Sequence, residues 1–411
     1  MPSVLRHTPY FELLEALGQP GCALCRLATR AVARYLDSLS YENVNDVDLR
    51  ATIREAIGLC NHHAWQFVTD TRELLGTAII YRDLIRTLQR RIRERPFQAA
   101  LAPRGGCVAC AARRTSILDS AELLTTSWSD PSLRQAFASS EGFCWNHLTA
   151  ALSAGRSAAE RRGLIEAQRA AWERRIARAR REGQPALLLE ALASAPGMTG
   201  VQMSPALADS PTSDRADAAE DLPEVGAGHC PVCAAVVDRL TRARGVDADG
   251  SRCSVHAWLP ALQPTVADLG PLEARLREAD RRLVDLLASD GDGPALLRWT
   301  RRFRRRRVWW PEAATETGCL VCREQSRVEL NAIARVEAAT LCVPHLRLMA
   351  PDRPDLEATL VRTRRTWHDQ ELQLAEYIRK HDYRFRHEPI GDERDAPAWA
   401  VGLVAGLAGV R

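Results

Sequence analysis

The 411-residue sequence lacks the features that would place it in a membrane, in the secretory pathway or in a familiar enzyme class. Its C-terminal apolar stretch, AWAVGLVAGLAG, falls short of the ~20 residues needed to cross a bilayer. The start, MPSVLRHTPYFELLEALG, has no long apolar segment of the kind found in signal peptides. We find no P-loop, no glycine fingerprint after a strand, no Gly-x-Ser-x-Gly and no His-Glu-x-x-His. We therefore expect a cytoplasmic protein. Whether it is an enzyme stays open, with a non-catalytic role favoured and no catalytic residue assigned.

What the sequence does have is a regular pattern of cysteine and histidine. All 12 cysteines belong to a Cys-x-x-Cys followed by a Cys-x-x-His, and this pattern occurs four times. Three thiolates and one imidazole match the ligand number and softness of a closed tetrahedral zinc site. We predict about four zinc ions per chain, each held within one repeat. The predicted sets are Cys22, Cys25, Cys60 and His63; Cys107, Cys110, Cys144 and His147; Cys230, Cys233, Cys253 and His256; and Cys319, Cys322, Cys342 and His345.

Other interpretations of these cysteines remain open. A disulfide framework leaves the four histidines unexplained, and cysteines that only fill a core do not need this spacing. An iron–sulfur cluster with the same ligands, or labile thiolates in a redox or metal-handling protein, would also use this ligand set. Where protein groups fill all four positions around zinc, no position is left for water or substrate, which disfavours zinc hydrolysis.

The sequence is expected to be almost wholly helical. Apolar residues from Leu24 to Leu39 recur at three- and four-residue steps, which predicts an amphipathic helix after the first Cys-x-x-Cys. Strand-like alternation is nearly absent. Long helices are predicted after each Cys-x-x-His, over residues 78–93, 158–182, 272–287 and 356–380.

Each repeat has two half-sites, its Cys-x-x-Cys and its Cys-x-x-His. The number of residues between them divides the repeats into two long and two short ones. The long repeats align without gaps over DVDLRATIREAIGLCNHH and DPSLRQAFASSEGFCWNH. This alignment predicts N-caps at Asp46 and Asp130 and helix ends at Gly58 and Gly142. We predict an all-α fold of four metal-clasped helical hairpin units, two long and two short, in which each ion joins two helix starts of one repeat.

Composition also divides the chain into two halves. Residues 194–228 are rich in Pro, Ser, Gly, Ala and Asp and lack apolar periodicity, which predicts a flexible linker. The predicted domains are a helical half over residues 1–193 with the first two sites, a second helical half over residues 229–395 with the other two, and an apolar tail over residues 396–411.

The string RWTRRFRRRRVWWPE has the most unusual composition in the chain. Guanidinium groups neutralise phosphates and indole faces stack on bases, so single-stranded nucleic acid is a candidate partner. Anionic membrane surfaces or another protein with acidic groups would satisfy the same chemistry, and a solvated helix with docked aromatics is the simpler alternative. Because the net charge is only +4, any electrostatic attraction must be local. The candidate residues are Arg298, Trp299, Arg301, Arg302, Phe303, Arg304, Arg305, Arg306, Arg307, Trp309 and Trp310.

Two further strings carry a resemblance. YENVND at residues 41–46 and RKHDYRFRHEPIGDE at residues 379–393 resemble an uncharacterised bacterial family of cysteine-rich helical proteins, a domain of unknown function. The resemblance implies a bacterial, intracellular protein but no established activity, substrate or partner. In the second repeat, LLTTSWSDPS stands where YENVND would be expected.

The polar residues of these two strings are also candidates for a polar pocket or an anion site. For residues 41–46 the simpler interpretation is a turn, with Asp46 as the cap of the next helix. For residues 379–393 it is the polar end of a long helix. The candidate residues are Tyr41, Glu42, Asn43, Asn45, Asp46, His381, Asp382, Tyr383, Arg384 and Arg386.

Taken together, these features favour a non-catalytic zinc-binding helical scaffold that binds a macromolecule, either nucleic acid or protein. The alternative is an iron–sulfur or labile-thiolate protein in redox chemistry or metal handling.

Overall fold

The computed structural model describes residues 7–71, 74–155, 157–192, 230–242, 266–289, 320–385 and 387–407. All regular elements in these ranges are helices, which confirms the all-α prediction. The chain forms two compact units, unit 1 from residues 1–31, 112–198 and 244–323 and unit 2 from residues 32–111, 199–243 and 324–411. Both units combine stretches from before and after the predicted linker, which itself lies outside the described ranges.

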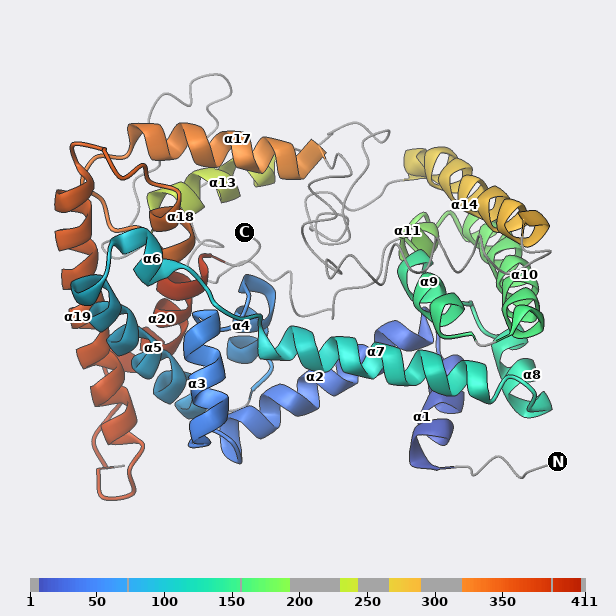
Figure 1. Cartoon of the computed structure of the whole chain (residues 1–411), viewed down its shortest axis with the longest axis horizontal. Helices are drawn as coiled ribbons and strands as arrows, with labels where there is room; N and C mark the ends of the chain where they lie inside the picture. Colours follow the sequence, from blue (N-terminus) through green and yellow to red (C-terminus); the bar gives the residue numbers. More distant parts are fainter. Residues whose placement is uncertain are drawn as a thin grey trace. The chain divides into compact units, whose positions relative to one another are not determined.

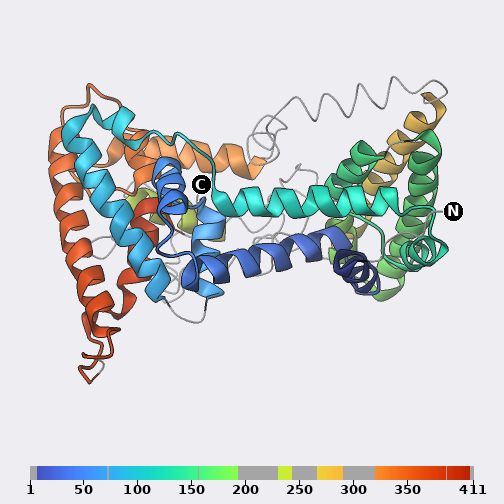
Figure 2. The same cartoon turned by 60° about the horizontal axis from the view of Figure 1, so that its bottom comes forward.

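Unit 1 is a helical bundle around one core. It contains α1 (Thr8–Leu17), the start of α2 (Ala23–Tyr41), most of α7 (Val108–Thr126), α8 (Pro131–Ser139), α9 (Trp145–Ala154), α10 (Ala158–Glu182), α11 (Ala186–Leu192), the 3-10 turn η3 (Val266–Asp268) and α14 (Leu269–Ser289). Helix α14 lies alongside α10 and α11 (Figures 1 and 2). Leu276 and Leu283 of α14 are fully buried in the core of unit 1, and Arg169 of α10 makes an ion pair with Asp280 at 2.7 Å.

Helix α10 shows how local sequence sets the ends of an element. Ser157 accepts a hydrogen bond from the Glu160 backbone, and the Glu160 side chain accepts one from the Ser157 backbone, which forms a capping box. The helix ends at Gly183, whose φ of +62° is a left-handed conformation that suits glycine. The predicted helix over residues 158–182 is therefore confirmed at both ends.

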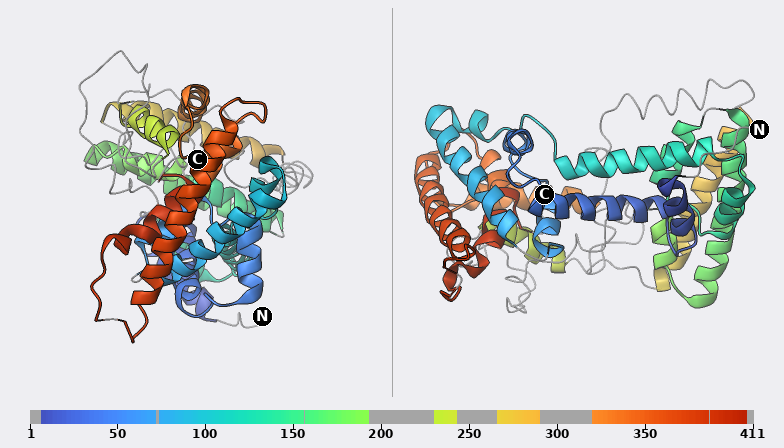
Figure 3. Two further views of the ribbon diagram at one scale, coloured as in Figure 1. Left: turned by 90° about the vertical axis from the view of Figure 1, so that its left-hand side faces the viewer. Right: turned by 90° about the horizontal axis from the view of Figure 1, so that it is seen from below.

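Unit 2 contains the other helices. They are the end of α2, α3 (Val47–Ala56), α4 (Asn61–Thr69), α5 (Leu75–Glu94), α6 (Phe97–Leu101), the first turn of α7, α13 (Pro231–Arg242), most of α17 (Leu320–Arg335), α18 (Val343–Arg347), α19 (Leu356–Lys380), η5 (Asp392–Asp395) and α20 (Ala396–Ala405). Helix α5 packs against α19 and α20 (Figure 3). Arg82 and Arg86 of α5 both reach Glu371 of α19, at 3.0 and 2.8 Å. Helices α5, α14 and α19 confirm the other predicted long helices.

The predicted N-caps are present, but the helices end before the predicted glycines: α3 is capped by Ile57 and α8 by Ser140. Asp46 accepts a hydrogen bond from the Leu49 backbone at 2.7 Å and begins α3, and Asp130 begins α8 in the same way. Gly58 and Gly142 have positive φ values of 92° and 72°, just before the Cys-x-x-His pairs.

The apolar C-terminal segment forms helix α20. Ala400 and Val401 are fully buried, and the helix packs against α4, α5, α18 and α19 within unit 2. Across the described ranges, every helix is too short or too polar to cross a membrane.

Candidate metal centres

Nine cysteines and three histidines of the described ranges meet in three groups of four. Site 1 consists of Cys22, Cys25, Cys144 and His147; site 2 of Cys60, His63, Cys107 and Cys110; and site 3 of Cys230, Cys233, Cys342 and His345. In each site the four candidate ligand atoms lie within 4.8 Å of one another. Each group takes its Cys-x-x-Cys from one repeat and its Cys-x-x-His from a different repeat.

This grouping corrects the predicted hairpins. We expected Cys22 and Cys25 to share an ion with the Cys-x-x-His of their own repeat, but repeats 1 and 2 exchange these pairs. Repeat 3 likewise pairs its Cys-x-x-Cys with the Cys-x-x-His of repeat 4. The other predicted ligands of repeats 3 and 4, Cys253, His256 and Cys319 and the side chain of Cys322, lie outside what the structure describes.

The length of α2 explains why a repeat does not close on itself. Cys22 and Cys25 lie at the start of this 19-residue helix, which is about 28 Å long at ~1.5 Å per residue. The start of α2 belongs to unit 1 and its end to unit 2, where α4 begins after Cys60. Helix α7 runs in the opposite order, from unit 2 to unit 1. Because of these two long helices, each unit contains one half-site of repeat 1 and one half-site of repeat 2.

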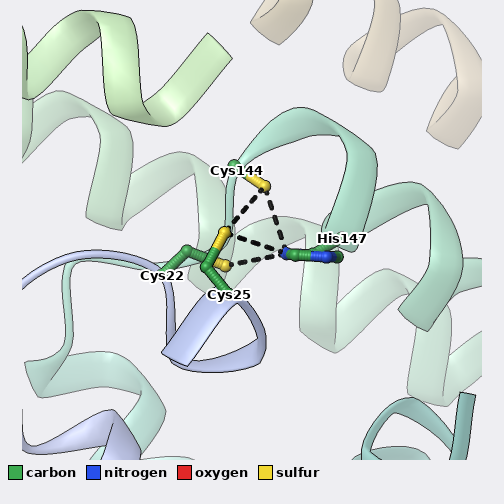
Figure 4. A group of neighbouring side chains, drawn as sticks. All are labelled: Cys22, Cys25, Cys144 and His147. Atoms are coloured by element: carbon green, nitrogen blue, oxygen red, sulfur yellow. Dashed lines mark hydrogen bonds between the residues drawn. The ribbon is translucent and has the colours of Figure 1, made fainter. Parts of the chain in front are cut away.

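The four side chains of site 1 converge on one point (Figure 4). The Nδ1 atom of His147 lies 3.4 Å from the Sγ atom of Cys22, 3.2 Å from that of Cys25 and 3.3 Å from that of Cys144. The sulfurs of Cys25 and Cys144 are 3.8 Å apart. One tetrahedral ion at ~2.3 Å from sulfur and ~2.0 Å from nitrogen requires separations of about 3.8 Å and 3.5 Å. The group has the size of a cage for one ion.

Helix α10 fixes the backbone that presents Cys144. The buried Gln168 accepts a hydrogen bond from the Phe143 N–H at 2.8 Å and donates one to the Phe143 carbonyl at 2.9 Å. Trp172 donates to the same carbonyl at 3.2 Å. A Cβ at Gly142 would lie 2.7 Å from the Gln168 amide nitrogen, so both this close approach and the positive φ require glycine.

Site 2 has the same ligand types in a more open setting. Cys60 is exposed, Cys107 and Cys110 are half-buried, and only His63 is buried. The His63 Nδ1 atom lies 3.3 Å from the sulfurs of Cys60 and Cys110 and 3.6 Å from that of Cys107. The sulfurs of Cys60 and Cys110 are 3.6 Å apart. These separations again fit one tetrahedral ion.

All four residues of site 3 are buried. The His345 Nδ1 atom lies 3.3, 3.4 and 3.1 Å from the sulfurs of Cys230, Cys233 and Cys342. On the other side of the ring, the His345 Nε2 atom lies 3.6 Å from a carboxylate oxygen of Glu329. A carboxylate behind a histidine ligand fixes the orientation of the ring and raises its basicity.

The ligands strongly perturb one another's pKa values. Hydrogen bonding with Cys144 and then with Cys22, together with burial, raises the pKa of Cys25 well above its usual value. Burial acts in the same direction on Cys144, but hydrogen bonds from Cys22 and Cys25 outweigh it and lower the pKa of Cys144. Burial lowers the pKa of His147, but the thiolate charges of Cys144 and Cys22 raise it to about 10. The opposite directions follow from the short distances between these groups, because a thiolate favours the protonated form of each neighbour.

The end of α20 contacts both sites of unit 2. Asn61 follows Cys60, one of the ligands of site 2, and donates a hydrogen bond to the Leu407 carbonyl at 2.7 Å. Trp65 donates to the Gly406 carbonyl at 2.8 Å. The Leu407 N–H lies 3.4 Å from the sulfur of Cys233 in site 3. This segment therefore connects helix α4 of site 2 to a ligand of site 3.

The described residues of the strings at 41–46 and 379–393 make contacts away from these sites. Asn43 donates to the Ser38 hydroxyl at 2.7 Å, and Arg384 pairs with Asp382 at 2.6 Å, so these described contacts stay local to each string. Arg386 lies outside the described residues, and a shared polar pocket stays a prediction. The whole Arg/Trp-rich segment from residue 298 to residue 310 also lies outside them.

Comparison with known proteins gives one distant similarity. The chain is 29% identical over 160 residues to the "Uncharacterized 23.9 kDa protein in xynA 3'region" of Caldicellulosiruptor sp. (strain Rt8B.4), a match that covers 37% of this chain and 76% of that protein. No family model matches the sequence, and no solved structure matches it. The similarity is therefore to an uncharacterised bacterial protein, without an activity attached.

Proposed function

We propose that the chain is a non-catalytic helical scaffold whose parts are clasped by zinc ions. The observation that carries the proposal is the convergence of three Cys3His groups, each with its ligand atoms within 4.8 Å. Where three thiolates and one imidazole fill a tetrahedral shell, no position remains for water or substrate. Structural zinc of this kind contributes on the order of 10 kcal/mol of binding free energy that is also folding free energy.

The ligand separations favour zinc over an iron–sulfur cluster. Sulfurs 3.6 to 3.8 Å apart are at the distance that two ligands of one tetrahedral ion require. A polynuclear cluster distributes its cysteines over several irons, which needs a wider ligand cage. Iron–sulfur chemistry is therefore the second candidate for the bound group.

We further propose about four ions per chain. If repeats 3 and 4 exchange their pairs as repeats 1 and 2 do, Cys319 and Cys322 combine with Cys253 and His256. The proposal for this fourth set comes from the symmetry of the exchange in sites 1 and 2.

The scaffold is proposed to bind a macromolecule through the Arg/Trp-rich segment. Its composition favours single-stranded nucleic acid, with a protein partner as the alternative. The expected result is binding to single-stranded oligonucleotides that weakens steeply with salt and is lost when the arginines at positions 304–307 are replaced by glutamine. Absence of binding at low salt would contradict this part of the proposal.

Elemental analysis of the purified, untagged full chain tests the proposed metal. We expect a colourless protein with about four zinc ions and no acid-labile sulfide. The Cys144→Ser variant should lose one ion, whereas replacement of the exposed, non-ligand His368 by alanine should lose none. A brown protein with visible absorption and sulfide would favour iron–sulfur clusters.

A further inference from the structure

We propose that site 2 exchanges its metal with ligands in solution while sites 1 and 3 retain theirs. The chemical class of its exchange partner is a small thiol or thiolate chelator, or a protein site that accepts zinc. The inference rests on the proposed function, since it requires that the sites hold zinc. It adds an activity, zinc transfer, to a protein that is otherwise a scaffold.

The first support is the accessibility of the ligands. Cys60 is exposed and Cys107 and Cys110 are half-buried, whereas every ligand of sites 1 and 3 is buried. Replacement of one zinc ligand by another requires that the incoming sulfur reach the ion. Among the three described sites, only site 2 presents a cysteine through which a solution ligand has such access.

The approach to site 2 is also open. Arg104, Gly105 and Gly106, which lead into α7, are exposed. A Cβ added at Gly106 would meet no heavy atom of the described residues within 4 Å. At Gly21, which precedes the Cys-x-x-Cys of site 1, the same Cβ would lie 3.7 Å from a carboxylate oxygen of Glu190. The backbone before Cys107 is therefore the less covered of the two.

The exchange step balances without an oxidant. The Zn–S bond to Cys60 breaks as a Zn–S bond to the incoming thiol forms, and the proton of that thiol passes to the Cys60 sulfur. Helix α4 does not need to unfold, because Asn61 and Trp65 remain hydrogen-bonded to the segment that ends at Leu407. The vacated cysteine therefore stays close to the other ligands and can bind zinc again.

The test measures zinc release from the zinc-loaded full chain in excess chromogenic chelator. We expect one zinc equivalent to leave in a distinct, faster phase than the others, because the chelator can reach the exposed Cys60 of site 2. Cys60→Ser should remove this fast phase and leave the slow equivalents. Cys144→Ser, the matched change in site 1, should remove a slow equivalent and leave the fast one.

A second measurement does not depend on how a variant folds. Brief alkylation of the zinc-loaded natural chain, read by peptide mass spectrometry, should modify Cys60 before any cysteine of sites 1 and 3. Release of all zinc in one phase, or a fast phase that survives Cys60→Ser, would overturn the exchange proposal and leave the zinc scaffold standing. A chain that holds no zinc would overturn both.

Discussion

Sites 1 and 2 are made from the same two repeats, yet one is enclosed and the other is open. Site 1 lies in the core of unit 1, where Gln168 and Trp172 hold the backbone beside Cys144. Site 2 lies in unit 2, where Cys60 is exposed. The comparison shows that the ligands set the chemistry of a site, while the helices packed around it set its accessibility.

The glycines before the two Cys-x-x-His pairs show the same contrast at one aligned position. A Cβ at Gly142 would lie 2.7 Å from the buried amide of Gln168, and a Cβ at Gly58 would lie 3.2 Å from a methyl group of Leu84. Both glycines have a positive φ. Repeats 1 and 2 therefore share the backbone turn at this glycine. The side chains of the neighbouring helix determine how closely the turn is packed.

The largest expected difference comes from removing one ligand in each site. Cys144→Ser should lower the zinc content by one ion and destabilise unit 1 by on the order of 4 kcal/mol, because loss of a structural metal is among the most damaging changes. This corresponds to a fall of roughly 10 °C in the unfolding temperature of unit 1. Cys60→Ser should also cost one ion, but with a smaller thermal effect. Metal analysis and calorimetry check this, and an equal fall in unfolding temperature for the two variants would remove the contrast between the sites.

A smaller effect is expected from the helix that supports site 1. Gln168→Leu should destabilise unit 1 by about 2 to 3 kcal/mol, because it leaves the buried N–H and carbonyl of Phe143 with fewer partners. Chemical denaturation followed by tryptophan fluorescence measures the change. Gln135→Leu on the exposed face of α8 is the control and should change stability little. If both variants unfolded alike, Gln168 would have no special role.

The aligned glycines give a finer comparison. Alanine at either position must adopt a left-handed backbone, which costs about 1 kcal/mol. Gly142→Ala should cost a further ~1 to 2 kcal/mol, because its Cβ collides with a buried, hydrogen-bonded amide rather than with a movable methyl group. Thermal unfolding of both variants measures the difference. If Gly58→Ala lowered the unfolding temperature more than Gly142→Ala, site 2 rather than site 1 would be the more tightly packed, contrary to our inference.

The smallest expected effect concerns the carboxylate behind site 3. Glu329→Gln should weaken zinc binding at this site by about 10-fold, since the histidine ligand loses a charged partner. Competition with a chelator of known affinity measures it, and no large change in helicity is expected. Glu337→Gln, on the chain beyond the end of α17, is a control that should leave the affinity unchanged.

Much of the fold could be predicted from the sequence because its signals are local. The apolar stripe from Leu24 to Leu39 predicts α2, and Asp46 begins α3 as the cap position requires. The residues that converge in sites 1 to 3 were also visible, because two-residue spacing between paired ligands is a short-range pattern.

The partners of each pair could not be predicted, because spacing along the chain does not say which pairs meet. From the sequence, Cys22 could share an ion with His63 or with His147. The structure shows that α2 separates Cys22 from His63, which lies in the other unit. Gln168 and Glu329 were missed for a related reason. They carry no motif of their own, and their roles depend on which backbone or ring they face.

The exchange of half-sites between repeats is the central claim, and one footprinting measurement tests it directly. In the zinc-loaded His147→Ala variant, brief alkylation followed by peptide mass spectrometry should show increased labelling of Cys22 and Cys25, which share site 1 with this histidine. Increased labelling of Cys107 and Cys110 instead, with Cys22 and Cys25 still protected, would show that each repeat closes on itself and would contradict the account.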